Sequence, residues 1–333
     1  MNETEIINNL KKIIKDRNAL SLNDDVFFDN KKGIIASIDT YNENIHYINF
    51  KNPHLIIKKV IRSSISDVIS KGVDPKYLLI SFASPKGNFT KKNLKLIINS
   101  IRSEQKKFNF SLIGGDTTLS SKSSFTICVF SYSKKIVKRN NCFKNDDIYV
   151  TGNVGDASIG LSILKKKINP SIKFKRYFIN KYYKPDLAFG FHKDLNKFAN
   201  SSMDISDGLL CDIKKLTSLK KFKFIIDLDL VPKSTYFNKL NIHNNITFNN
   251  HLFKGDDYQI LFTAKKKYRK TIIKYAKNWN QKLTRIGNIT NGKDNYLKID
   301  GKLKKIKDYH GYIHNFRWDY LLPFGVFFVM CGF

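Results

Sequence analysis

Residues 111–118 read S-L-I-G-G-D-T-T, and this stretch decides how the rest of the chain is interpreted. An apolar run ends here in Gly114 and Gly115, which permit positive φ angles and a close approach of the backbone to a ligand. Asp116 then offers a hard oxygen ligand, and the free N–H groups of such a turn can face an anion. An ordinary strand followed by a turn has the same composition, so the stretch gains meaning only through similar clusters elsewhere.

Length and charge set the broad class. The chain has 333 residues, of which 42% are hydrophobic, so it can bury a sizeable core. At roughly 100–200 residues per domain, this length predicts two domains. The net charge is +31, from 59 lysines and arginines against 28 acidic residues. Because the lysines are spread along the chain rather than clustered on one segment, we expect most of this charge to be solvated surface rather than a nucleic-acid interface.

The cysteines and the apolar segments bear on the cellular compartment. Cys128, Cys142, Cys211 and Cys331 lie far apart with no paired spacing, which argues against a zinc site or a disulfide scaffold and favours a reducing cytoplasm. The first residues form no hydrophobic signal segment, and the longest apolar run, residues 321–333, is shorter than the about 20 residues that span a bilayer. We therefore expect a cytoplasmic protein that does not enter a membrane.

The spacing of apolar residues predicts alternating helices and strands. Helices are predicted within residues 1–20, from Pro53 to the turn at Gly72, and over residues 91–107. Strands are predicted over residues 33–40, 77–82, 108–113 and 125–132 in a first unit, and over 147–152, 223–230 and 259–263 in a second. The glycines of residues 114–115 would then belong to a turn that follows a strand.

Short acidic clusters recur beside glycine and serine at the predicted turns. They are Asp24-Asp25, Asp39, Asp67, Asp116, Asp204 with Asp207, and Asp256-Asp257. Carboxylates without histidine or cysteine ligands suit Mg²⁺, an ion that neutralises charge during phosphoryl transfer. Asp67 lies on the apolar face of its predicted helix, where a carboxylate needs a cation as partner. The dinucleotide-binding fingerprint is absent, and Leu161 stands where a Walker A loop requires lysine.

The order of these motifs resembles the thiamine-monophosphate kinase family of the aminoimidazole-ribonucleotide-synthetase-like superfamily. The motifs are D-D at residue 24, S-x-D-T at 37, His46, S-D-x₄-G-x-D-P at 66, L-I-G-G-D-T-T at 112, T-G-x-x-G-D at 151, D-I-S-D-G-L at 204, G-D-D-Y at 255 and G-Y-x-H at 311. L-I-G-G-D-T-T with D-I-S-D-G-L is specific to the superfamily. His46 and the closing G-Y-x-H point to the kinase within it.

This resemblance implies an α+β fold of two domains, each a mixed β-sheet packed with α-helices, at residues 1–137 and 138–316, followed by an apolar tail at 317–333 of unknown role. It also implies a homodimer that transfers the γ-phosphoryl group of ATP directly to thiamine monophosphate with the help of several Mg²⁺ ions. Carried over by position, the metal ligands are Asp25, Ser37, Asp39, Asp67, Asp116, Asp204 and Asp207; the ATP contacts are Gly115, Asp116, Arg139 and Ser206; and the thiamine-phosphate contacts are His46, Asp256 and Tyr312. Arg139 is further expected to stabilise transition-state charge.

The chain departs from the family pattern at several places. The usual glycine before Asp24 is Asn23, the usual threonine after Ser37 is Ile38, the usual alanine-methionine before Gly72 is Ser70-Lys71, and a usual glutamate is shortened to Asp256. All the core metal carboxylates are kept, so we expect activity with a looser substrate pocket.

Three of the assigned residues are equally consistent with a purely structural role. From the sequence alone, Arg139 can be a solvated member of a basic run, His46 a loop residue and Tyr312 part of the core. Two further functions also stay open for the whole chain, namely another ATP-using enzyme of the same superfamily and a basic nucleic-acid-binding protein. The second of these would bind oligonucleotides with a steep dependence on salt.

Overall fold

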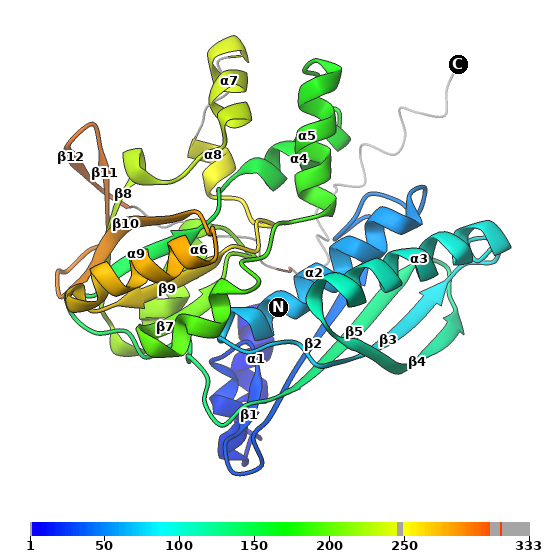
Figure 1. The fold of residues 1–333 in the computed structure, drawn as a ribbon, viewed down its shortest axis with the longest axis horizontal. Helices are drawn as coiled ribbons and strands as arrows, with labels where there is room; N and C mark the ends of the chain where they lie inside the picture. The colour runs from blue at the N-terminus through cyan, green and yellow to red at the C-terminus, as the bar shows by residue number, and fades with distance from the viewer. Residues whose placement is uncertain (1, 245–248, 307–313, 315–333) are drawn as a thin grey trace, which may run out of the picture.

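The computed structural model describes residues 2–244, 249–306 and 314, which form two β-sheets with α-helices packed against them (Figure 1). The α+β class expected from the sequence is therefore confirmed. In the described part of the chain, none of the helices combines the length and the apolar character that crossing a membrane requires.

The first sheet has the strand order β1-β2-β5-β3-β4. Its strands are β1 (Phe27–Asp29), β2 (Ile34–Asn42), β3 (Tyr77–Ser84), β4 (Ser111–Leu119) and β5 (Ser124–Tyr132). β3 and β4 run parallel and are connected by helix α3 (Lys91–Phe108), whereas the other pairs are antiparallel. Helices α2 (Pro53–Ser70) and α3 cover one face of this sheet (Figure 1).

The second sheet has the strand order β12-β11-β8-β10-β6-β9-β7. Its strands are β6 (Asp147–Thr151), β7 (Ala199–Asp204), β8 (Lys223–Asp227), β9 (Ile260–Ala264), β10 (Leu283–Thr290), β11 (Tyr296–Ile299) and β12 (Lys302–Lys305). The remaining α-helices are α1 (Glu3–Leu10), α4 (Asp156–Leu164), α5 (Ile172–Tyr183), α6 (Leu209–Thr217), α7 (Thr235–Asn244), α8 (Asn249–Leu252) and α9 (Arg269–Asn278). The sheet is mixed, since β8 and β11 run parallel and its other pairs are antiparallel.

Helix α2 lies between the two sheets and is buried on nearly all sides (Figure 1). Isoleucines and valines such as Ile56 and Val60 belong to the apolar core, and α2 contacts strands β2 and β5 of the first sheet. The helix also contacts β7 of the second sheet, and there the small side chain of Ser66 reaches Asp204. Small polar residues allow the close approach of a second sheet, so this helix holds side chains against both halves of the molecule.

The apolar core is continuous between the two halves of the chain. One cluster of buried residues joins Phe108 and Phe125 of the first half to Phe191 and Phe262 of the second. Leu261, next to Phe262 on β9, belongs to a second cluster, because successive residues of a strand point to opposite faces of its sheet. The shared core keeps the two sheets in contact along α2.

Two expected elements differ from the observed ones. The predicted strand over residues 108–113 is β4 (Ser111–Leu119), so the two glycines lie inside a strand and not in a turn after it. Phe108 ends α3, and Asn109 closes that helix in the left-handed conformation. The helix expected within residues 1–20 ends at Leu10, and residues 17–22 form a separate 3₁₀ segment.

Candidate active site

Three carboxylates from three different elements meet between the two sheets. Asp39 lies on β2, Asp67 on α2 and Asp204 at the end of β7. Ser37, two residues before Asp39 on the same face of β2, donates a hydrogen bond of 2.6 Å to Asp67 Oδ2. Ser66 donates to Asp204 in the same way. Four of the residues assigned to metal binding are therefore brought together by β2, α2 and β7.

The electrostatics of this group indicate too much negative charge for the surrounding protein. Burial raises the pKa of Asp67 well above its ordinary value, with added repulsion from Asp39, Asp204 and Asp25. Burial also raises the pKa of Asp39, although hydrogen bonds from Tyr41 and Ser64 oppose this. For Asp204, burial and then the charge of Asp25 raise the pKa to about 7. Burial is the largest cause of all three shifts and repulsion adds to it, and a nearby cation would oppose both by stabilising the charged carboxylates.

The donor set fits a hard divalent cation. Asp67 offers a carboxylate oxygen beside the hydroxyl of Ser37, and Asp39 and Asp204 lie close enough for their charges to act on Asp67. The oxygens of the three carboxylates do not all lie within 4.8 Å of one another, as those of Asp207 and Asp212 and the sulfur of Cys211 do. Among the residues that the structure describes, no lysine or arginine forms an ion pair with any of the three carboxylates. Magnesium prefers such oxygen ligands and keeps several waters or phosphate oxygens besides them. The types of donor therefore suit the magnesium ion expected from the sequence, while the three carboxylates are not drawn together around one point.

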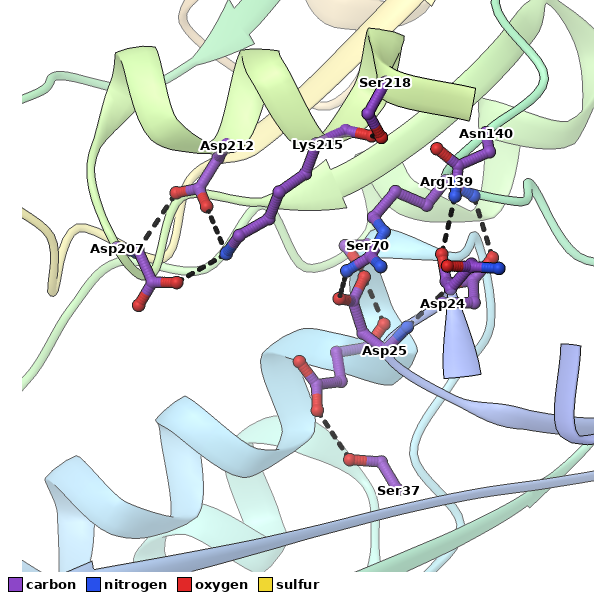
Figure 2. A network of polar contacts seen from close by, with 12 residues as sticks. Asp24, Asp25, Ser37, Ser70, Arg139, Asn140, Asp207, Asp212, Lys215 and Ser218 are labelled. Atoms are coloured by element: carbon purple, nitrogen blue, oxygen red, sulfur yellow. Dashed lines mark hydrogen bonds and ion pairs between the residues drawn. The ribbon is translucent and has the colours of Figure 1, made fainter. Parts of the chain in front are cut away.

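Asp24 and Asp25 have a different environment from these three carboxylates. Asp25 Oδ1 accepts a hydrogen bond of 2.8 Å from Arg139 Nη1, and Asp24 Oδ2 accepts one of 2.8 Å from the backbone N–H of Arg139 (Figure 2). Lys71 contacts both carboxylates. Burial alone would raise the pKa of Asp25, but the charges of Lys71 and Arg139 outweigh it and lower that pKa below its ordinary value. This acidic pair is already compensated by basic side chains.

Asp207 lies on the loop before α6, and a lysine also holds it. Lys215 contacts Asp207 and lies 2.9 Å from Asp212 Oδ1, so its ammonium group lies between the two carboxylates (Figure 2). Asp212 also accepts hydrogen bonds of 3.1 Å from the backbone N–H groups of Asp207 and Gly208, which fixes the loop. The backbone N–H of Asp256 donates a hydrogen bond to the carbonyl oxygen of Ser206, the residue assigned to ATP. This bond joins the loop before β9 to the loop before α6.

Two of the residues assigned to thiamine phosphate, His46 and Asp256, are linked to α2 through Lys59, which lies nearer the start of the helix than Asp67. Lys59 Nζ is 2.6 Å from Asp256 Oδ1 and 4.0 Å from the centre of the Tyr182 ring. The Tyr182 hydroxyl donates a hydrogen bond of 2.9 Å to the carbonyl oxygen of His46. One chain of contacts therefore links His46 to Asp256 through Tyr182 and Lys59. Tyr312 lies outside the described residues, but His314 packs against His46 with ring centres 5.4 Å apart.

The protonation of His46 follows from its contacts. The backbone N–H of Asn42 donates a hydrogen bond of 2.9 Å to His46 Nδ1, so this nitrogen carries no proton. Burial, and then the neighbouring His314, lower the pKa of His46. The ring is thus neutral near pH 7, with its proton on Nε2, which can donate to a substrate.

Gly115 and Asp116 lie apart from the three-carboxylate group. Both are exposed on β4, the edge strand of the first sheet, and Asp116 pairs with Ser81 of β3. In the described ranges, Asp116 makes no ion pair or hydrogen bond with the other assigned ligands. A Cβ on Gly115 would lie 1.8 Å from the carbonyl oxygen of Ile80, so strand pairing alone requires glycine there. Gly114 has a positive φ of 152°, which glycine permits, and it lies where the pairing register of β3 and β4 shifts.

Sequence reasoning missed the three lysines that contact these carboxylates. Lys59 and Lys71 belong to α2 or its end, and Lys215 to α6. Only Lys71 carried a signal, as a departure from the family pattern, because lysine is too common in this chain to stand out.

Comparisons with known proteins show what the chain is similar to. The family model for the N-terminal domain of AIR synthase related protein matches residues 19–133. The thiamine-monophosphate kinase of Nitrosopumilus maritimus is 31% identical over 92% of this chain and 97% of its own length. That of Buchnera aphidicola subsp. Schizaphis graminum is 31% identical over 85% of this chain and 88% of its own length.

A solved structure extends the similarity to three dimensions. The structure described as AaThiL complexed with AMPPCP and TMP has a TM-score of 0.83 and 25% sequence identity, and covers 94% of this chain and 97% of that chain. Sequence identity and fold thus agree over nearly the full length of both proteins. The chain belongs to the thiamine-monophosphate kinase family.

Proposed function

We propose that this enzyme transfers the γ-phosphoryl group of ATP to the phosphate of thiamine monophosphate, giving ADP and thiamine diphosphate. Family membership supports this, as does the likeness to a structure complexed with AMPPCP and TMP. The observation that carries the proposal is the group of three carboxylates, the buried Asp204 and the partly buried Asp39 and Asp67, whose pKa values are all raised. Such a group is costly to keep unless a cation and its phosphate ligands use it.

The reaction does not need a general base to activate the attacking group. An oxygen of the thiamine-monophosphate phosphate attacks the γ-phosphorus, the bond from that phosphorus to the bridging oxygen breaks, and ADP leaves with the electron pair. The attacking group is already an anion, so the main barrier is the approach of two negative groups. When bound, magnesium neutralises charge on the phosphates. The residues of the chain hold that charge in place and orient the two substrates.

The metal ligands of the proposal are Ser37, Asp39, Asp67 and Asp204. Asp116 and Asp207 stay proposed ligands, although in this chain Asp116 lies apart on β4 and Lys215 contacts Asp207. Asp25 differs, because both of its oxygens already contact cations of the chain. For ATP we propose contacts with Gly115, Asp116, Arg139 and Ser206. Arg139 Nε is buried and has no partner in the described part of the chain, so it is available to a phosphate oxygen.

For thiamine monophosphate we propose a pocket at His46, Asp256 and Tyr312. The contact chain through Lys59 and Tyr182 supports this, because it links two of these residues across the interface of the sheets. His46 would donate its Nε2 proton to the phosphate, and Asp256 would face the positively charged thiazolium ring.

We also propose a homodimer formed by residues 1–137, with the domain boundary at residue 138, in the cytoplasm. The edge strand β4 supports the dimer, since all nine of its residues are exposed and include Ile113 and Leu119. An exposed apolar edge strand is a common place for pairing with a second copy.

A coupled assay for ADP release tests the proposed reaction. Wild-type protein with ATP and MgCl₂ should release ADP only when thiamine monophosphate is added, and Asp67→Asn should lower this rate by about a hundredfold or more. Asp227→Asn, which removes a carboxylate paired with Lys298 on the second sheet, is the matched control and should keep the rate. Absence of thiamine-phosphate-dependent ADP release from folded wild-type protein would reject the proposal and leave another acceptor to be found.

A further inference from the structure

Lys71 is a fully buried lysine at the end of helix α2. Its side chain is 0% exposed, and its ammonium nitrogen has three oxygen neighbours. These are Asp24 Oδ1 at 2.7 Å, Asp25 Oδ2 at 2.5 Å and the carbonyl oxygen of Ser202 at 3.0 Å. An ammonium group has three protons to donate, so all three are used at this place.

The two carboxylates that face Lys71 are saturated by groups of the chain. The other oxygen of Asp25, Oδ1, accepts a hydrogen bond of 2.8 Å from Arg139 Nη1. Asp24 accepts backbone N–H groups of Asp25 at 2.9 Å and Arg139 at 2.8 Å, one on each oxygen (Figure 2). Two basic side chains thus balance two acidic ones in a place that water hardly reaches. A further cation would have to displace one of these partners.

The neighbouring carboxylates show the opposite situation. Asp39, Asp67 and Asp204 form no ion pair with lysine or arginine anywhere in the described chain, and their hydrogen-bond partners are hydroxyl groups. Asp25 is close enough to Asp204 and Asp67 for its charge to act on both. The acidic site is therefore divided into a half that lacks a cation and a half that already contains one.

We infer that the ammonium group of Lys71 takes the position of one metal ion in this site, so that the chain holds Asp24 and Asp25 with its own cation and binds one divalent ion fewer than it would without Lys71. The inference rests on the proposed metal site at Asp67 and its neighbours. It makes Asp25 a ligand of Lys71 and Arg139 instead of a metal ligand. The consequence is that part of the charge in this site is permanent and independent of the magnesium concentration.

The test counts Mn²⁺ ions bound per chain, with no nucleotide present, by electron paramagnetic resonance of the free ion. Mn²⁺ is used because it accepts the same oxygen ligands as Mg²⁺ and gives a signal. Lys71→Met keeps the length of the side chain and removes its charge, so it should bind one more Mn²⁺ per chain than wild type. Lys298→Met, which breaks an ion pair on the second sheet, should leave the number unchanged.

Asp25→Asn keeps the inference testable if Lys71→Met does not fold. Because Asp24 still holds Lys71, this variant should fold and bind as many ions as wild type; loss of one ion would make Asp25 a metal ligand and overturn the inference. An unchanged number for folded Lys71→Met would overturn it as well. Asp67→Asn separates the two proposals, since it should lose an ion, and if it does not, the proposed metal site is wrong.

Discussion

The ammonium nitrogen of Lys59 lies 2.6 Å from a carboxylate oxygen of Asp256, and this contact joins helix α2 to the loop before β9 across 197 positions of the chain. The same oxygen accepts a hydrogen bond of 3.1 Å from the Tyr258 hydroxyl. Lys59 is only 1% exposed, so its charge depends on Asp256 for compensation. The position of this carboxylate in the proposed substrate pocket is therefore set from α2.

Lys59→Met should weaken the binding of thiamine monophosphate more than that of ATP. Loss of one charged hydrogen bond predicts a rise of about tenfold or more in the KM for thiamine monophosphate. Steady-state kinetics with each substrate varied in turn measures this. Lys58→Met is the matched control, because Lys58 is the neighbouring residue and faces Glu104 instead. A KM that rises only for ATP would contradict the assignment of Asp256 to the thiamine-monophosphate pocket.

The stability of the metal-free protein should fall as the pH rises from about 4 to about 7. Burial, and then the charge of Asp25, raise the pKa of Asp204 from the ordinary value of 3.8 to about 7 in the folded protein. The folded state thus binds more protons than the unfolded state in this range, and raising the pH favours unfolding. Thermal unfolding in EDTA at several pH values, followed by circular dichroism, measures the effect.

Two comparisons decide whether Asp204 is the cause. Asp204→Asn should unfold at a higher temperature than wild type near pH 7 in EDTA, since it removes a buried charge and can still accept the hydrogen bond of Ser66. Excess MgCl₂ should stabilise wild type more than this variant. If the unfolding temperatures of wild type and Asp204→Asn depend on pH in the same way in EDTA, the pKa of Asp204 is not raised in the folded protein.

Gly255→Ala should damage both stability and activity. A Cβ at this position would lie 1.6 Å from the carbonyl oxygen of Ser206, so the loop before β9 would move away from the loop before α6. The expected loss is about 3 kcal/mol of unfolding free energy. Urea unfolding and ADP release measure the two effects. Gly292→Ala is the control and should be neutral, because its nearest atom is 3.7 Å away.

Leu119→Lys should weaken the proposed homodimer. Leu119 is 68% exposed at the end of β4, and a lysine there would replace an apolar side chain with a charge on the edge strand of each copy. Sedimentation velocity over a range of protein concentrations measures the change from dimer to monomer. Leu303→Lys, on β12 of the other sheet, is a matched exposed leucine and should have no effect. A wild-type protein that stays monomeric at all concentrations contradicts the dimer itself.

Much of the first sheet could be predicted from residue periodicity. The pattern of Ile56, Val60 and their neighbours gave helix α2, and the alternation over residues 125–132 gave β5, because both have one face in the core. The prediction was wrong at β4. Glycine and aspartate usually mark turns, but here they continue an edge strand that has no second neighbour to exclude them.

Part of the candidate site could be predicted from the sequence, and the part that could not depends on tertiary packing. Asp39, Asp67 and Asp204 carry the signal of acidic residues in a basic chain, and the family resemblance gave them a common role. The partners of Asp25 and Asp256 were beyond prediction, because Lys71 and Lys59 are two among 59 basic residues and reach these carboxylates only through the packing of α2. Contacts between distant segments of this kind follow from tertiary packing and leave little trace in local sequence.

Helix α2 sets the distance between two parts of the proposed reaction site. Lys59 holds Asp256 at one end and Lys71 holds Asp25 at the other, twelve residues apart, which is about 18 Å along a helix. A single inserted residue between them would turn one end by about 100° relative to the other and lengthen the helix by about 1.5 Å. The number of residues between Lys59 and Lys71 therefore sets how far apart Asp256 and Asp25 are held, and an insertion there would break one of the two contacts.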